Sequence, residues 1–179
     1  MIILVGPSAS GKTEIAKALI KNYNYKKFVT TTTRSIRINE TNNIDYHFIS
    51  IDEFENKIKN NEFIEYVKYN DNYYGTEKRE IDDNKVLIVE PQGLKHFKSL
   101  NDSSIISFYI NVDKEIRKNR MFLRKDKEED IEKRLVCDDQ VFNKDVLDDV
   151  DFVIENNSTT SIDKIAETIN DIYLKVANH

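Results

Sequence analysis

The chain has 179 residues, of which 33% are charged and 39% hydrophobic, a length that suits one α/β core with small inserts. Its formal net charge of −5 argues against a general nucleic-acid binder, because long phosphate backbones require a broad basic surface. The single cysteine, Cys137, excludes an internal disulfide. With no signal peptide and no apolar stretch near the roughly 20 residues of a membrane span, we expect a cytoplasmic protein without a membrane partner.

Periodicity predicts a strand, a loop and a helix at the start of the chain. Residues 1–5 form an apolar run typical of a buried strand. After the break at residues 6–13, apolar side chains recur at helical spacing to about Tyr23. Residues 28–50 show little helical period and predict short strands and loops. A capping-box pattern at residues 50–53 then predicts a helix over about 51–60.

The remaining elements alternate between strands and helices. Residues 63–69 and 73–75 are β-rich and predict a hairpin. Helices are expected from near Gly93 and over Lys114–Leu123. Another is expected after the mixed-charge segment 124–130, ending at about Phe142, and an amphipathic one from Ile162 to Val176. Further strands are expected at residues 86–89, 105–112 and 152–154. This alternation predicts an α/β fold with a mainly parallel sheet covered on both faces.

The first glycine-containing segment is a candidate phosphate-binding loop. It matches Gly-x-x-x-x-Gly-Lys-Thr between a buried strand and a helix, the setting that makes this pattern specific. Lys12 is expected to reach the β- and γ-phosphates of ATP, and Thr13 to place a hydroxyl on Mg²⁺. A chance glycine turn is the alternative, but the loop uses two of only four glycines. The predicted ATP-binding residues of the loop are Gly6, Ser8, Ala9, Ser10, Gly11, Lys12 and Thr13.

Four downstream motifs indicate the phosphate acceptor. They are TTTTRSIRINE at residues 30–40, DYHF at 45–48, FIE at 63–65 and NYYGT at 72–76. In this order, and together with the loop, they resemble the guanylate kinase family over nearly the whole chain. The resemblance implies transfer of the γ-phosphate of ATP to GMP, with Mg²⁺ accompanying ATP.

The resemblance also implies a division of the chain. It predicts a P-loop NTPase-type three-layer core formed by residues 1–28, 84–123 and 136–179. A small β-rich GMP-binding insert is expected at residues 29–83, and a helical lid at 124–135. We expect a monomer or a weak homodimer with ATP and GMP as its partners.

Four residues are implied to hold the GMP phosphate. Guanidinium forks suit phosphate oxygens, and phenol hydroxyls add neutral donors. Without the motif, the two arginines would read as a solvated surface pair and the two tyrosines as half-buried strand aromatics. The matching positions are Arg34, Arg37, Tyr46 and Tyr74.

Guanine recognition is implied to depend on Glu65. A carboxylate accepts from both N1–H and the N2 amine of guanine, whereas adenine presents a lone pair at N1. Thr30 and Thr76 match positions whose hydroxyls contact O6. Near the next strand the chain departs from the family, since Ile88 replaces one acid and Glu90 replaces another. The family's second acid lies beside guanine and the metal–phosphate region, and Glu90 is expected to do the same with a longer side chain.

Three arginines on or next to the lid are implied to act in catalysis, namely Arg120, Arg124 and Arg134. Their charge would stabilise the transferring phosphoryl group, and with Lys12 and Arg34 they are the predicted catalytic residues. A run of mixed charge is otherwise usually a solvated helix face. The family lid contains glycines, which this segment lacks.

Several weaker signals complete the sequence analysis. Asn156 matches a family position near adenine and is predicted to bind ATP. Ala9, Asn39 and Asn43 stand where the family has glycine, and asparagine tolerates the left-handed conformation. The histidines, among them His96, show no metal-ligand spacing and are expected in structural or surface roles.

Two other functions are compatible with parts of this pattern. The first is a guanylate-kinase-like module that binds a partner without catalysis, which would have no need for Lys12 and Thr13. The second is a P-loop kinase with another small phosphorylated acceptor. Glu65, Thr30 and Thr76 argue against that second alternative, and the missing first acid near Glu90 leaves it open.

Overall fold

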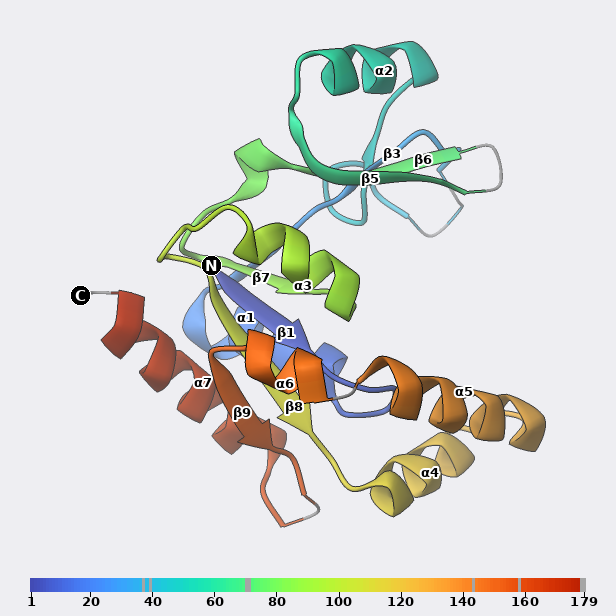
Figure 1. The fold of residues 1–179 in the computed structure, drawn as a ribbon, viewed down its shortest axis with the longest axis vertical. Helices are drawn as coiled ribbons and strands as arrows, with labels where there is room; N and C mark the ends of the chain where they lie inside the picture. The colour runs from blue at the N-terminus through green and yellow to red at the C-terminus, as the bar shows by residue number, and fades with distance from the viewer. Residues whose placement is uncertain (37, 39, 70–71, 143, 158, 178–179) are drawn as a thin grey trace.

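A computed structural model describes residues 1–36, 38, 40–69, 72–142, 144–157 and 159–177. Its centre is a five-stranded parallel sheet in the order β2-β7-β1-β8-β9 (Figure 1). The strands are β1 (Ile2–Val5), β2 (Lys26–Lys27), β7 (Lys85–Ile88), β8 (Ile106–Asn111) and β9 (Phe152–Glu155). The predicted α/β fold with a parallel sheet is confirmed.

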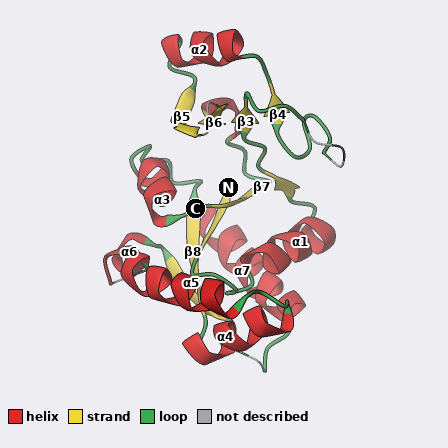
Figure 2. Cartoon of the chain, turned by 90° about the vertical axis from the view of Figure 1, so that its right-hand side faces the viewer, coloured by secondary structure: helices red, strands yellow, loops and turns green. Residues whose placement is uncertain are grey.

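Helices cover both faces of this sheet, as Figure 2 shows. Side chains alternate along a strand, so Ile2 and Leu4 of β1 pack toward α1 (Lys12–Tyr23) and α7 (Ile162–Ala177). Ile3 and Val5 pack on the other side, against α3 (Pro91–Lys98) and α6 (Lys144–Asp149). Because β1 is buried on both faces, its sequence is continuously apolar rather than alternating.

A second sheet forms a separate layer above the core. It has the order β4-β3-β6-β5, and its strands all lie between Thr31 and Glu77, inside the range predicted for the insert. Phe54 holds this layer together, with ring centroids 4.3 Å from Phe63 and 5.0 Å from Tyr73. The elements are β3 (Thr31–Thr32), β4 (His47–Phe48), α2 (Ile51–Lys59), β5 (Phe63–Tyr69) and β6 (Asn72–Glu77). The predicted capping box at Ser50 is present.

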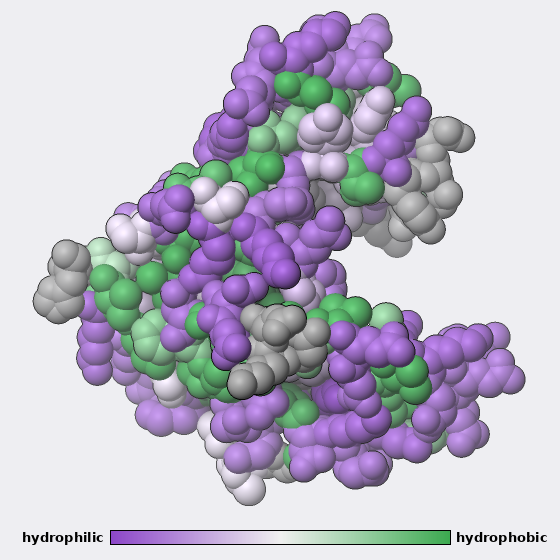
Figure 3. Space-filling view, viewed as in Figure 1, coloured by the Kyte–Doolittle hydropathy of each residue, from purple (hydrophilic) through white to green (hydrophobic). Residues whose placement is uncertain are grey.

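Two helices project from the opposite end of the core. They are α4 (Lys114–Leu123) and α5 (Glu128–Val141), and Met121, Ile131 and Leu135 bury a small cluster between them. The space-filling view shows an open cleft between this helix pair and the second sheet (Figure 3). None of the helices that the structure describes is long and apolar enough to cross a membrane.

The structure corrects some predicted boundaries. Helix α3 begins at Pro91 rather than near Gly93, because the fixed φ of proline suits the first helical position. The short elements β2 and α6, and a 3-10 turn at Lys78–Glu80, were not predicted. These segments are too short to show a hydrophobic period of their own.

Candidate functional site

The loop between β1 and α1 requires glycine at two positions. Gly6 has φ 152°, and a Cβ there would lie 2.7 Å from the carbonyl oxygen of Ile110. Gly11 has φ 97°, and a Cβ there would lie 2.5 Å from Nδ2 of Asn156. Larger residues would therefore displace the loop from the sheet beneath it.

Two of the positions where the family has glycine keep a left-handed backbone without glycine. Ala9 has φ 59° in the phosphate loop, and Asn43 has φ 66° in the insert. The Ala9 side chain packs against the α4–α5 cluster, which compensates for the less favourable backbone. Asn39 lies outside the described residues.

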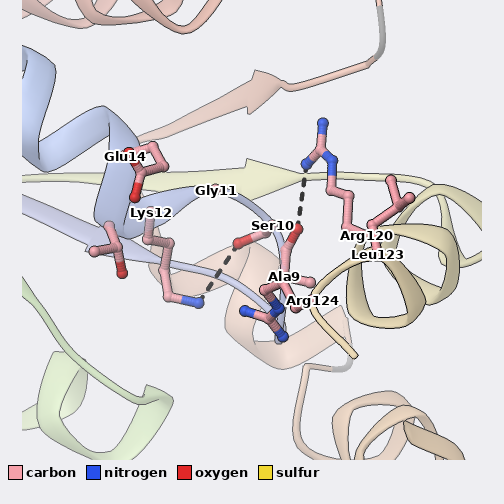
Figure 4. A pocket seen from close by; sticks show the side chains of 9 residues that line it. Ala9, Ser10, Gly11, Lys12, Glu14, Arg120, Leu123 and Arg124 are labelled. Atoms are coloured by element: carbon pink, nitrogen blue, oxygen red, sulfur yellow. Dashed lines mark hydrogen bonds between the residues drawn. The ribbon is translucent and has the colours of Figure 1, made fainter. Parts of the chain in front are cut away.

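Lys12 is the first residue of α1, and its side chain folds back toward the loop (Figure 4). Its ammonium donates to the carbonyl oxygens of Gly6 and Pro7, the latter at 2.9 Å. Burial lowers the pKa of Lys12, and the charges of Glu90 and Asp138 oppose this shift. A cavity of about 360 Å³ opens beside the loop. It is lined by Ala9, Ser10, Gly11, Lys12, Thr13, Glu14, Arg120, Leu123 and Arg124.

Arg120 and Asn156 hold the loop from two sides. Arg120 of α4 donates to the carbonyl oxygen of Ala9 at 3.2 Å and to that of Asn156 at 3.3 Å. The Asn156 amide donates to the carbonyl oxygen of Ser10 at 2.7 Å and is only 1% exposed. Asn156 therefore supports the loop from beneath, and Arg120 lines the cavity beside it.

The other two predicted lid arginines share one carboxylate. Arg124 lies 2.9 Å from Asp126 and Arg134 lies 3.0 Å from the same oxygen. The two arginine side chains are 53% and 51% exposed, and exposed ion pairs contribute little stability. Separating either guanidinium group from Asp126 would therefore cost little free energy.

A second cavity, of about 500 Å³, lies between the insert and the core. Of the residues predicted to bind GMP, it brings together Thr30, Tyr46, Glu65, Tyr74, Thr76 and Glu90. Glu65 of β5 accepts from the Thr76 hydroxyl at 3.4 Å and lies 2.7 Å from Nδ1 of His96. His96, for which the sequence predicts a structural or surface role, also lines this cavity.

Arg34 lies beside the second cavity, behind Tyr46. Its guanidinium donates bidentate hydrogen bonds to the Glu40 carboxylate at 2.9 and 2.7 Å. These bonds raise the pKa of Arg34. Its charge also faces the rings of Tyr46 and Phe48, each centroid 5.5 Å away. Arg37 lies outside the described residues.

A buried carboxylate that the sequence analysis did not identify connects α5 to the phosphate loop and to α4. Asp138 accepts from the backbone amide of Ser8 at 3.0 Å and from its hydroxyl at 3.2 Å. The buried Arg117 donates to the same carboxylate at 3.0 Å. No local signal marks this contact, because Ser8 and Asp138 are 130 residues apart.

We expect Asp138→Asn to lower the free energy of unfolding by about 2 kcal/mol, because Arg117 would lose its buried ionic partner. The loss is limited because Asp139 remains 3.8 Å from Arg117. Urea denaturation measures the change. The matched control is Asp139→Asn, whose half-exposed side chain predicts a change below about 1 kcal/mol. Equal effects of the two variants would contradict the importance of the buried pair.

The described residues contain no group of three or more His, Cys, Asp or Glu side chains arranged to hold a metal ion. Thr13, the predicted Mg²⁺ ligand, lines the cavity beside the phosphate loop. A threonine hydroxyl is an oxygen ligand of the kind that Mg²⁺ prefers, and it suits an ion that arrives with nucleotide phosphates.

Comparisons with known proteins agree with this geometry. The chain is 34% identical over 177 residues to a guanylate kinase of Clostridioides difficile, covering 94% of this chain and 85% of that protein. It is 32% identical over 179 residues to one of Clostridium tetani, with 96% and 82% covered.

Solved structures share the fold. A crystal structure of guanylate kinase from Anaplasma phagocytophilum aligns with a TM-score of 0.63 at 22% identity, covering 98% of this chain and 84% of that one. A shikimate kinase from Acinetobacter baumannii aligns with a TM-score of 0.55 at 15% identity, with 97% and 92% covered. The guanylate kinase family profile matches residues 1–174. The chain belongs to the guanylate kinase family.

Proposed function

We propose that the chain transfers the γ-phosphoryl group of ATP to GMP, giving ADP and GDP. The observation that carries this proposal is that residues of both cavities lie at the same edge of the parallel sheet. Glu90 lines the cavity that contains Glu65, and it follows β7, which pairs in parallel with β1 directly before the phosphate loop. A donor on the loop and an acceptor in the second cavity would therefore meet at Glu90.

The phosphate loop would hold ATP. The N–H groups of the loop and of the first turn of α1 favour an anion, and Lys12 would leave the carbonyl oxygens of Gly6 and Pro7 for the phosphates. The Thr13 hydroxyl would hold the Mg²⁺ that arrives with ATP and neutralises phosphate charge. Asn156 is proposed to act through the loop, since its buried amide holds Ser10.

The second cavity would hold GMP. Arg34, Arg37, Tyr46 and Tyr74 would bind its phosphate. Tyr46 and Tyr74 stand together, with ring centroids 6.3 Å apart. Glu65 would accept from N1–H and the N2 amine of guanine, while Thr30 and Thr76 would face O6. The acceptor phosphate is already anionic, so transfer requires orientation and charge neutralisation rather than a general base.

Closure of the cleft would complete the site. We propose a core of residues 1–28, 84–123 and 136–179, a GMP-binding insert at 29–83 and a lid at 124–135. Arg124 and Arg134 would exchange Asp126 for the transferring phosphoryl group, whose charge they would stabilise with Arg120. Closure also excludes water and so protects ATP from hydrolysis.

A coupled assay of ADP release with ATP and Mg²⁺ tests this proposal against GMP, dGMP, AMP, CMP and UMP. We expect turnover with the guanine nucleotides only, because Glu65 suits their paired donors. Turnover with another monophosphate in place of GMP would indicate a different acceptor. Calorimetric binding of GMP without turnover would instead indicate a binding module.

A further inference from the structure

The acceptor cavity contains a histidine that the proposed reaction does not use. His96 lies on α3, and its Nδ1 is 2.7 Å from Oε2 of Glu65. The other oxygen, Oε1, accepts from the Thr76 hydroxyl at 3.4 Å. Each oxygen of Glu65 therefore has a partner, one from α3 of the core and one from β6 of the insert.

The packing of α3 brings its first turns against this carboxylate. A Cβ built at Gly93 would lie 3.5 Å from Oε1 of Glu65, so the start of the helix faces the same group as His96. The side chains of Glu65 and His96 are 29% and 42% exposed. The pair is thus partly shielded from water while both members still line the cavity.

Other donors also line the cavity, among them Thr30, Tyr74 and Gln92. The two hydrogen bonds described for the Glu65 side chain nevertheless come from Thr76 and His96. If His96 were lost, only the longer one, from Thr76, would remain. The orientation of Glu65 therefore depends mainly on His96.

We propose that His96 is a positioning residue for guanine recognition. Its Nδ1–H holds the Glu65 carboxylate in the orientation that accepts both guanine donors. Each carboxylate oxygen has two lone pairs, so Oε2 can accept from His96 and from guanine at the same time. A carboxylate fixed before GMP arrives loses less side-chain entropy on binding, which favours affinity. This inference rests on the proposed function and names a residue that sets its acceptor affinity.

The first test compares His96→Ala with His96→Asn. We expect His96→Ala to raise both KM and the calorimetric Kd for GMP by about tenfold, because one hydrogen bond to a charged group is lost. The kcat and the KM for ATP should stay unchanged. Asparagine places an amide N–H near the former Nδ1, so His96→Asn should recover most of the affinity. Lys95→Ala, an exposed change on the same helix, serves as the control.

A double-mutant cycle with Glu65→Gln shows whether His96 acts through Glu65. If it does, His96→Ala should have little further effect on GMP binding in the Glu65→Gln background. The inference would be overturned if the effects of the two substitutions on the Kd for GMP multiplied in full in the double variant. Unchanged GMP binding in His96→Ala would also overturn it. Absence of GMP binding to the unmodified chain would instead reject the proposed function, so the two failures are distinguishable.

Discussion

Replacing Lys12 with alanine is expected to lower kcat for transfer from ATP to GMP by about 10³-fold, because it removes a preorganised charge from the transferring phosphates. The Lys12 ammonium now lies on the carbonyl oxygens of Gly6 and Pro7, so it is held at the loop before ATP binds. The coupled ADP-release assay measures the change, with GMP and ATP both saturating.

The matched control for this change is Lys17→Ala. Lys17 lies on the same helix, but its side chain is exposed and pairs with Glu14 at 2.8 Å. Its removal should change kcat by less than about twofold, as expected for an exposed ion pair. A kcat for Lys12→Ala similar to that of the unmodified chain would exclude phosphate stabilisation by Lys12.

Glu65→Gln is expected to lower kcat/KM for GMP by about 10³-fold. The NH2 group of glutamine would face an N–H donor of guanine, so that one hydrogen bond is replaced by a contact between two donors. The change keeps the size of the side chain and removes one of its two acceptors. Most of the loss should appear in the KM for GMP, since the contact lies on the base and not on the reacting phosphate. Initial rates over a range of GMP concentrations separate the change in kcat from the change in KM.

Glu62→Gln provides the control on the adjoining segment of the insert. Glu62 binds Lys57 at 2.8 Å and is absent from the lining of the acceptor cavity. We expect its kcat/KM for GMP to remain within about twofold of the unmodified value. A Glu65→Gln variant with similarly intact GMP turnover would show that another group reads the base.

Short-range patterns predicted much of the core. The continuous apolar run of β1, the glycine spacing of the loop and the capping box at Ser50 are local signals, and each appears in the structure. The motifs also selected side chains that line one cavity, although Glu65 and Glu90 come from different layers of the protein.

Contacts between distant segments had no comparable signal. Asp138 meets Ser8 only after α5 folds back over the loop, and nothing near Asp138 in the sequence indicates this. His96 similarly gains its importance from the packing of α3 against β5. Helix α3 also begins at Pro91, two residues before Gly93, because proline suits the first helical position. Such features depend on tertiary contacts rather than on local propensity.

The single cysteine of the chain lies exposed on α5, the helix that also carries Arg134. Cys137 therefore offers one unique thiol for a fluorophore or a spin label, without removal of any other reactive sulfur. A probe at this position would test whether α5 moves in the proposed closure when nucleotides are added. If it does, stopped-flow spectroscopy would show whether ATP or GMP triggers the movement first, without any change to the sequence.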